Sequence, residues 1–263
     1  MTEDPRRLDG KVIIVTGSTQ GLGEEIAREA ADLGAAGIVI SGRSADRGAA
    51  VAASLSGNGC RSIFVQAELA DVEACRGIVG RCDEEFGRVD GLVNSAACTE
   101  RGTLEDTSPE HWDKIMAINV RAPFLLIQES VRLMKRAGEG GSIVNILSVA
   151  AHGGPAKLTP YSASKGALAT LTKNAGHSLM PDRIRVNGIN VGWMATPNEH
   201  VVQKSEGQPD NWLEIAEANM PYGRILRPSD IAGLVTYLLS DAAQMMNGAL
   251  IDYHPYVMGI FDS

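Results

Sequence analysis

The stretch Val12-Ile-Ile-Val-Thr-Gly-Ser-Thr-Gln-Gly-Leu-Gly23 decides the fold of this chain. Four apolar residues run directly into a glycine-rich turn, and a helical pattern follows, which predicts a buried strand, a tight turn and a helix. Gly17 permits the turn, Gly21 lets the backbone approach a pyrophosphate, and Gly23 allows close helix packing. The helix N-terminus favours an anion, so the stretch predicts a dinucleotide site, with a ligand-free connector as the alternative. The expected cofactor contacts are Gly17, Ser18, Thr19, Gln20, Gly21, Leu22 and Gly23.

Short apolar runs alternate with longer helical patterns along the rest of the chain. We predict strands at Lys11–Thr16, Gly37–Ser41, Ser62–Gln66, Gly91–Asn94, Ser142–Leu147, Arg185–Asn190 and Ala249–Tyr253. We predict helices at Leu22–Leu33, Asp46–Leu55, Val72–Phe86, Pro109–Arg136, Pro160–Met180 and Ser229–Leu239. This alternation predicts an α/β fold with a parallel sheet covered by helices on both faces. No change of composition marks a linker, so we expect residues 1–263 to form a single dinucleotide-binding catalytic domain.

The segment Trp193–Tyr222 interrupts the alternation. It is long and polar, and it contains Gly207, Pro209 and Pro221. Long loops within compact domains are commonly functional, so residues 193–222 are predicted to form a substrate lid. The alternative is that the two tryptophans of the segment are core anchors.

Composition and charge exclude several classes of function. The 263 residues carry a formal net charge of −8 and no run of Lys and Arg, which argues against nucleic acid or an anionic membrane as a partner. No apolar run is long enough to span a membrane. The four cysteines lack C-x-x-C spacing, so no metal site is expected, and the polar N-terminal sequence favours a reducing cytoplasm.

The second predicted strand ends at Ile40-Ser-Gly-Arg43. A site that selects NAD usually has an acidic residue near this point to bind the ribose 2′-hydroxyl, but this chain has Gly42 and Arg43 there. A guanidinium pairs with a phosphate and stacks on a flat ring. Arg43 therefore favours NADP(H), with NAD(H) still possible and a solvated loop arginine as the alternative.

Tyr161 and Lys165 are four residues apart just after Thr159-Pro160. Thr159 is a plausible N-cap and Pro160 a plausible first residue, so the two side chains should share one face of the first helical turns. A nearby cation and the positive end of the helix dipole both favour the phenolate. The spacing indicates a proton-transfer pair; the alternative is two exposed side chains on a surface helix.

With Asn119 and Ser148 lying between the glycine turn and this pair, the chain resembles the short-chain dehydrogenase/reductase family over nearly its whole length. The T-G-x-x-x-G-x-G spacing at Thr16–Gly23 and the Y-x-x-x-K at Tyr161–Lys165 are similar to those of the family's ordinary, shorter branch. The resemblance implies a Rossmann-type, doubly wound, seven-stranded sheet of order 3-2-1-4-5-6-7. It also implies an NAD(P)(H)-dependent oxidoreductase that interconverts a secondary alcohol and a ketone.

The same resemblance gives four residues catalytic roles. Tyr161 is expected to be the acid/base, and Lys165 to lower the tyrosine pKa and bind the nicotinamide ribose. Ser148 is expected to hold the substrate oxygen. Asn119 is expected to hold a water that links Lys165 to solvent, although a mid-helix Asn is otherwise typical of a polar surface.

Further cofactor positions follow from the resemblance, and some depart from the family pattern. The positions are Glu68, Leu69, Asn94, Ala96, Gly192, Met194 and Thr196. The family's Asn-Asn-Ala-Gly is Asn94-Ser-Ala-Ala97 here, so a methyl group replaces a glycine beside the cofactor. Val191 replaces a proline before Gly192, and residues 253–256 replace a glycine-rich turn.

Substrate and assembly are less constrained by the sequence. The substrate-side candidates are Ser148, His152, Trp193, His200 and Trp212, which flank the catalytic serine or lie in the predicted lid. The polar lid favours a polyol, sugar or hydroxy acid over a long acyl chain, and a non-catalytic dinucleotide sensor on the same fold is the alternative function. The family resemblance implies a homo-oligomer, a dimer or homotetramer built on the two long helices. Gly176 is expected to allow close packing, against another subunit in one reading.

Overall fold

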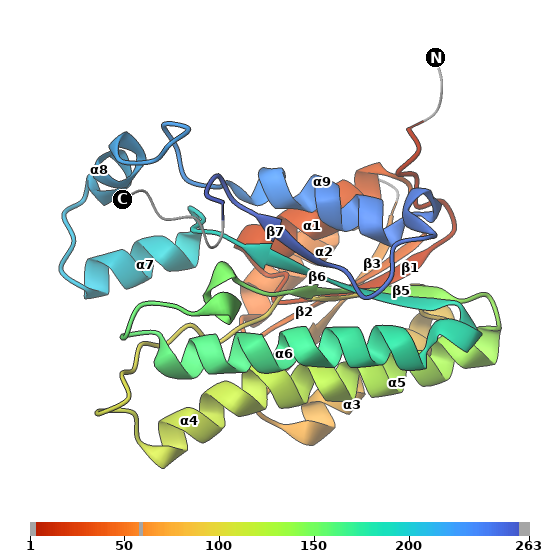
Figure 1. Cartoon of the computed structure of the whole chain (residues 1–263). Coiled ribbons are helices and arrows are strands. Elements are labelled where there is room, and N and C mark those ends of the chain that lie inside the picture. Colours follow the sequence, from red (N-terminus) through yellow and green to blue (C-terminus); the bar gives the residue numbers. More distant parts are fainter. Residues whose placement is uncertain (1–3, 58–59, 258–263) are drawn as a thin grey trace.

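The computed structural model describes residues 4–57 and 60–257, and Figure 1 shows one sheet between two layers of helices. Within the described residues, seven parallel strands form the sheet in the order β3-β2-β1-β4-β5-β6-β7, as predicted. The strands are β1 (Val12–Thr16), β2 (Gly37–Gly42), β3 (Arg61–Gln66), β4 (Gly91–Asn94), β5 (Gly141–Ile146), β6 (Ile184–Val191) and β7 (Leu250–Tyr253).

Helices cover both faces of this sheet (Figure 1). One layer holds α1 (Gly21–Asp32), α2 (Ala45–Gly57) and α9 (Pro228–Leu239). The opposite layer holds α3 (Val72–Phe86), α4 (Pro109–Met116), α5 (Ala122–Ala137) and α6 (Thr159–Ser178). Three short turns of 3-10 helix cover Val149–His152, Met180–Asp182 and Asp241–Ala243. None of the helices in the described part of the chain has the length and apolar character needed to cross a membrane.

Strand β1 explains why the first apolar run has no alternation of polar and apolar residues. Ile13 and Val15 pack into the core beneath α1, α2 and α9, whereas Val12 and Ile14 pack into the core on the opposite face. A strand that is covered on both faces has no solvent-facing position. The run therefore enters the glycine turn from the centre of the molecule.

The long helix predicted at Pro109–Arg136 is interrupted. Helix α4 ends at Met116, and a π-helical turn over Ala117–Arg121 precedes α5. In this turn the backbone N–H of Ala122 donates to the carbonyl of Ala117, five residues earlier. Single π-turns inside α-helices are frequent at functional sites, and this one contains Asn119.

Helix α6 begins one residue earlier than predicted. Leu158, and not Thr159, is the N-cap, and the Thr159 hydroxyl donates to the carbonyl of Ala156 at 2.8 Å instead of capping the helix. Pro160 still lies in the first turn, where its missing N–H is not needed. Tyr161 and Lys165 consequently lie one helical turn apart, as expected.

Near the other end of α6, Gly176 packs within its own chain. A Cβ atom there would lie 2.9 Å from Oδ1 of Asn247, and the Asn247 amide donates to the Gly176 carbonyl at 2.8 Å. The absent side chain therefore lets the turn before β7 approach the helix. The close packing expected of Gly176 is therefore found within the chain, and a contact with another subunit stays a prediction.

Residues 193–222 fold into two short helices, α7 (Pro197–Ser205) and α8 (Trp212–Ala218). They lie beyond the carboxyl end of β6, on the left of Figure 1. Trp212 is buried and forms a small separate core with Ala216 and Ile225. At least one tryptophan of the segment is therefore an anchor, as the alternative interpretation held.

Candidate active site

A cavity of about 1180 Å³ opens at the carboxyl ends of the central strands. Its walls come from the glycine turn after β1 and from the loops after β2, β3, β4, β5 and β6, and helices α7 and α8 complete it. In parallel α/β sheets this edge is the usual ligand site. The cavity has a cofactor end near the glycine turn and a substrate end near α7.

The glycine turn leaves bare backbone facing the cavity. A Cβ atom on Gly17, whose φ is +67°, would lie 2.8 Å from Cα of Ala96, and one on Gly23 would lie 2.5 Å from the carbonyl oxygen of Gly17. Side chains at either position would fill the space beside the N-terminus of α1. These residues fit the pyrophosphate of a dinucleotide, because the helix N-terminus and free backbone N–H groups favour an anion.

The other residues of the turn divide into two groups. Thr19, Gln20 and Leu22 line the cavity with the glycines, as predicted. Ser18 does not: its hydroxyl is buried, donates to the carbonyl of Val15 at 2.6 Å and accepts from the N–H of Ser41 at 3.0 Å. Ser18 therefore shapes the turn from beneath, and its contact with the cofactor stays a prediction.

Two arginines lie at the far part of the cofactor end. Arg43 is exposed, lines the cavity and places Nη1 4.0 Å from Oε2 of Glu68. Arg47, in the first turn of α2, also lines the cavity and was missed from the sequence. The available signal was a second arginine close in sequence to Arg43, just after the predicted second strand. Leu69 lines the same wall.

Asn94 lies beneath the cavity wall and not in it. Its side chain is buried, and its amide donates to Oδ1 of Asn145 at 2.8 Å. The Asn145 amide in turn donates to the hydroxyl of Thr172 at 2.9 Å. Asn94 therefore joins β4 to β5 and α6, and its contact with the cofactor stays a prediction; Ala96, two residues later, does line the cavity.

Gly192, Met194 and Thr196 line the opposite wall, in agreement with their predicted place. The hydroxyl of Thr196 accepts a hydrogen bond of 3.1 Å from the backbone N–H of Glu199 and so caps α7. The substituted positions Ala97 and Val191 also line the cavity.

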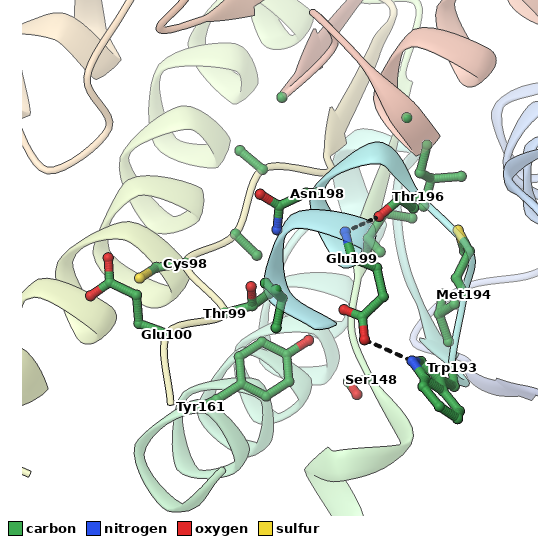
Figure 2. Close-up of a pocket in the computed structure, with 18 of the residues that line it drawn as sticks. Cys98, Thr99, Glu100, Ser148, Tyr161, Trp193, Met194, Thr196, Asn198 and Glu199 are labelled. Atoms are coloured by element: carbon green, nitrogen blue, oxygen red, sulfur yellow. Dashed lines mark hydrogen bonds between the residues drawn. The ribbon is translucent and has the colours of Figure 1, made fainter. Parts of the chain in front are cut away.

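The phenol of Tyr161 points into the substrate end of the cavity, beside the hydroxyl of Ser148 (Figure 2). Although Tyr161 is only half-buried by exposed area, desolvation of the phenol raises its pKa. The hydrogen bond with Ser148 lowers the tyrosine pKa in part, because it favours the phenolate. Ser148 is held in turn at the start of a 3-10 turn, where its Oγ accepts from the N–H of Ala150.

Lys165 is buried against the Tyr161 ring. Its Nζ lies 5.7 Å from the ring centre and donates to the carbonyl of Ile146 at 2.6 Å. Desolvation lowers the pKa of Lys165 to about 8. Burial of the phenol dominates the tyrosine pKa, and the ammonium lies over the ring and close to a backbone carbonyl, so the lowering of that pKa by Lys165 stays a prediction.

Asn119 is buried in the π-turn, and the surface alternative for this residue is wrong. Its Oδ1 accepts from the N–H of Cys98 at 2.7 Å, and its amide donates to the Cys98 carbonyl at 2.9 Å and to the Ser164 hydroxyl at 3.0 Å. Ser164 immediately precedes Lys165. Asn119 therefore fastens the loop after β4 to the catalytic helix.

A carboxylate at the substrate end was missed from the sequence. Glu199, in the first turn of α7, accepts hydrogen bonds from Trp193 Nε1 at 2.8 Å and from Gln203 Nε2 at 2.7 Å. Figure 2 shows the carboxylate between Trp193 and the Tyr161 hydroxyl. Its charge contributes to the raised pKa of Tyr161.

An ion-pair cluster at the mouth of the substrate end was missed as well. Arg101 Nε donates to Oε1 of Glu206 at 2.7 Å, and Lys157 Nζ donates to Oε2 of the same carboxylate at 2.6 Å. These hydrogen bonds lower the pKa of Glu206. Because Glu206 follows α7, the cluster ties this helix to the loops after β4 and β5.

Of the predicted substrate residues, Ser148, Trp193 and Trp212 line the cavity, and the two tryptophan rings stack with centres 5.7 Å apart. The two histidines do not line it. His152 Nε2 lies 2.9 Å from Oδ1 of Asp252, and His200 Nδ1 accepts from Trp212 Nε1 at 3.1 Å. Each histidine ring is held by another side chain, Asp252 or Trp212, and the two substrate contacts stay predictions.

Comparisons with known proteins show the family to which this chain belongs. The family profile described as Enoyl-(Acyl carrier protein) reductase matches residues 17–253. The NADP-dependent (R)-specific alcohol dehydrogenase of Lentilactobacillus kefiri is 35% identical over 92% of this chain and 94% of its own. The L-rhamnose 1-dehydrogenase (NAD(P)(+)) of Azotobacter vinelandii is 33% identical over 91% and 93%. The crystal structure of a short-chain type dehydrogenase/reductase from Mycobacterium marinum, 29% identical, superposes with a TM-score of 0.85 over 95% of this chain and 96% of that one. The chain therefore belongs to the short-chain dehydrogenase/reductase family of NAD(P)-dependent oxidoreductases.

Proposed function

We propose that this enzyme interconverts a polar secondary alcohol and its ketone, with Tyr161 as the acid/base and NADP(H) as the preferred cofactor. One observation carries the proposal: the phenol of Tyr161 and the hydroxyl of Ser148 meet inside the cavity, with the ammonium of Lys165 against the tyrosine ring. Two hydroxyl groups at one point provide a proton donor and a second hydrogen bond for a single substrate oxygen.

A bound nicotinamide supplies or accepts the hydride. In reduction, Ser148 holds the carbonyl oxygen and Tyr161 gives it a proton; in oxidation, Tyr161 takes the proton from the alcohol. The positive charge of Lys165 stabilises the phenolate that forms after proton donation. Asn119 keeps Lys165 in place through Ser164, and the water relay inferred from the family resemblance belongs to this proposal.

The preference for NADP(H) rests on the two arginines of the cofactor end. Arg43 and Arg47 both line the cavity beyond β2, and a 2′-phosphate would be their natural counter-ion. The name of the Lentilactobacillus relative, which is NADP-dependent, supports this choice. NAD(H) would bind with fewer charge-assisted contacts.

The substrate is proposed to be a polyol, sugar or hydroxy acid, covered by residues 193–222 as a lid. Helices α7 and α8 contribute polar and aromatic side chains to the cavity, and the ion pairs of Glu206 hold α7 against two other loops. The Azotobacter relative is named for a sugar substrate. A lid fastened by ion pairs would open for exchange and exclude water when closed.

We also propose a homo-oligomer, a dimer or tetramer, built on the helices of one face. Trp112 of α4 is 39% exposed and Phe124 of α5 is 46% exposed, which is unusual for large apolar residues on neighbouring helices. Light scattering in solution should report at least a dimer. A clean monomer would contradict this part of the proposal.

The experiment that tests the function is a turnover screen of simple alcohols, polyols, sugars, hydroxy acids and their ketones, run separately with NADP(H) and NAD(H). The absorbance of the reduced nicotinamide gives the rate. Turnover of at least one polar class with higher catalytic efficiency for NADP(H) is expected. Tight cofactor binding without turnover of any class would favour the non-catalytic sensor, and a much higher efficiency with NAD(H) would contradict the roles of Arg43 and Arg47.

A further inference from the structure

We infer that Glu199 selects the substrate by accepting a hydrogen bond from a second hydroxyl next to the reacting carbinol, so that the enzyme prefers a neutral vicinal diol or sugar. This inference rests on the proposed alcohol and ketone chemistry and narrows its substrate class. It excludes hydroxy acids from the substrate classes that the sequence analysis left open, which were polyols, sugars and hydroxy acids.

The position of Glu199 is fixed by its own helix. Its backbone N–H donates to the capping hydroxyl of Thr196 at 3.1 Å, so the residue lies in the first turn of α7. Its side chain is only 16% exposed and lines the cavity. A carboxylate with so little access to water depends on the protein and the substrate for its hydrogen bonds.

The two carboxylate oxygens of Glu199 differ. Oε1 accepts from both Trp193 and Gln203, at 2.8 and 2.7 Å, and lies 4.0 Å from Nη2 of Arg101. Oε2 has no hydrogen bond to any residue in the described part of the chain. In Figure 2 this second oxygen lies on the side of the Tyr161 hydroxyl. The free acceptor therefore faces the place where the substrate reacts.

The nearby cations are paired with carboxylates of the protein. Arg101 is engaged by Glu206 through Nε and by the carbonyl of Thr99 through Nη1, at 2.7 and 3.3 Å, and its Nη2 lies 4.0 Å from Oε1 of Glu199. Lys157 is engaged by the same Glu206. A substrate carboxylate placed at Oε2 of Glu199 would face the oxygen that has no such partner, and like charges at short range repel.

A hydroxyl group on the substrate, unlike a carboxylate, is uncharged and can donate a hydrogen bond. It would donate to Oε2 of Glu199 while its oxygen accepts from water or from other donors. Because Ser148 and Tyr161 hold the reacting oxygen and Glu199 lies next to them in Figure 2, the donor belongs on a carbon close to the carbinol. A simple alcohol has no second hydroxyl, so its binding would leave Oε2 without water and without a hydrogen bond. This unpaired acceptor selects against the simple alcohol.

Two matched series of alcohols test the inference with NADP⁺. One series is 2-butanol, 2,3-butanediol and 3-hydroxybutyrate; the other is cyclohexanol, 1,2-cyclohexanediol and 2-hydroxycyclohexanecarboxylate. In each series the wild-type enzyme should have a kcat/KM for the diol that is roughly 10-fold or more above the simple alcohol, the ratio expected for a hydrogen bond to a charged group. The hydroxy acid should be the poorest substrate.

The variant Glu199→Gln keeps an oxygen for Trp193 and Gln203 but removes the charge and the free acceptor. The ratio of its kcat/KM for the diol to that for the simple alcohol should fall by roughly 10-fold, and the ratio of the hydroxy acid to the simple alcohol should rise, because comparing substrates within one variant cancels any general effect of the lost charge on Tyr161. Glu214→Gln on the exposed face of α8, outside the cavity, is the matched control and should change neither ratio.

The outcomes separate this inference from the proposed function. Turnover of no alcohol in either series by the wild-type enzyme, with either cofactor, overturns the proposed function and the inference with it. Turnover in which Glu199→Gln lowers the diol and the simple alcohol by the same factor leaves the function intact and overturns the inference, because that result describes a structural role in the lid. A wild-type preference for the hydroxy acid overturns it as well.

Discussion

The ammonium of Lys165 lies over the ring of Tyr161, with Nζ 5.7 Å from the ring centre. The same Nζ donates to the carbonyl of Ile146, at the end of β5. A nearby cation favours a phenolate in general, but burial of the phenol outweighs such effects here, and the tyrosine pKa is raised. The pair therefore combines a weakly held proton on the lysine with a phenol whose pKa is raised by burial.

Replacement of Tyr161 by phenylalanine removes the proposed acid/base and leaves the ring. We expect kcat to fall by about 10²- to 10⁴-fold, the usual contribution of a positioned proton donor. Cofactor affinity, measured by titration of protein fluorescence, should stay near the wild-type value because the glycine turn is unchanged. Wild-type turnover by this variant would refute the proposed mechanism.

Lys165→Met should change the pH dependence of stability. The lysine pKa is about 8 in the folded protein and 10.5 in the reference state, so between these values the unfolded chain binds more protons. The contribution of Lys165 to the free energy of unfolding therefore rises with pH, by up to about 1.4 kcal/mol per pH unit. We expect the Met variant to be relatively more stable at pH 7 and to lose this advantage as the pH rises from 8 to 10.

Denaturant unfolding at a series of pH values measures this difference. Lys173→Met, an exposed substitution on the same helix, is the control and should show no such slope. A difference between wild type and Lys165→Met that does not change with pH would mean that the buried lysine does not titrate in this range.

Gly23→Ala should damage both folding and cofactor binding. The added methyl would lie 2.5 Å from the carbonyl oxygen of Gly17, which is backbone and has little room to move. We expect a loss of about 1–3 kcal/mol of stability, typical of overpacking, and a weaker affinity for NADP(H). In α3, Gly77 has open space around it, so Gly77→Ala should stabilise the protein by up to about 1 kcal/mol. Equal effects of the two substitutions would contradict the proposed close approach at the turn.

Arg43→Ala and Arg47→Ala should each weaken the use of NADP(H) more than that of NAD(H). Each guanidinium is expected to contribute a charge-assisted hydrogen bond to the 2′-phosphate, which corresponds to roughly a 10-fold change in KM for NADP(H). Steady-state kinetics with both cofactors gives the ratio. If the variants lower efficiency with both cofactors equally, the arginines contact the adenine or the loop and do not select the phosphate.

Glu206→Gln should loosen the lid. The carboxylate pairs with both Arg101 and Lys157, and its lowered pKa keeps it ionised until the pH falls well into the acidic range. Partly exposed ion pairs contribute little each, so we expect the substrate KM to rise about fivefold with a small change in kcat. Limited proteolysis within residues 197–218 should become faster, and high salt should reduce the difference between variant and wild type. Unchanged KM and unchanged cleavage would show that the pairs do not hold the lid.

The sheet could be predicted because its strands carry their own signal. Strand β2 was expected at Gly37–Ser41 and covers Gly37–Gly42, since an apolar run buried on both faces ends where the cavity begins. The spacing of Tyr161 and Lys165 correctly predicted that both side chains lie on one face of a helix, one turn apart, beside the cavity. Local sequence patterns were sufficient to predict an element wherever its structure depends on residues that are close in sequence.

The rest of the site depends on partners that are distant in sequence. Glu206 pairs with Arg101, which lies 105 positions earlier, and the partner of His152, Asp252, lies 100 positions later. A surface Glu and a cavity Glu look alike in a sequence, since only the fold decides which one loses its water. The π-turn likewise has no marker, because it is stabilised by contacts of Asn119 with the loop after β4.

Because of the π-turn, the number of residues that join α4 to α5 decides whether both helices can keep their contacts. Each residue in an α-helix turns the chain by about 100°, so a deletion of one residue between Ala117 and Arg121 would restore a regular helix but rotate its first half against its second. Either the buried stripe of α5 or the bonds between Asn119 and Cys98 would then be lost. Substitutions in this helix should therefore be tolerated far more readily than insertions or deletions, and relatives that retain the activity should retain the extra residue.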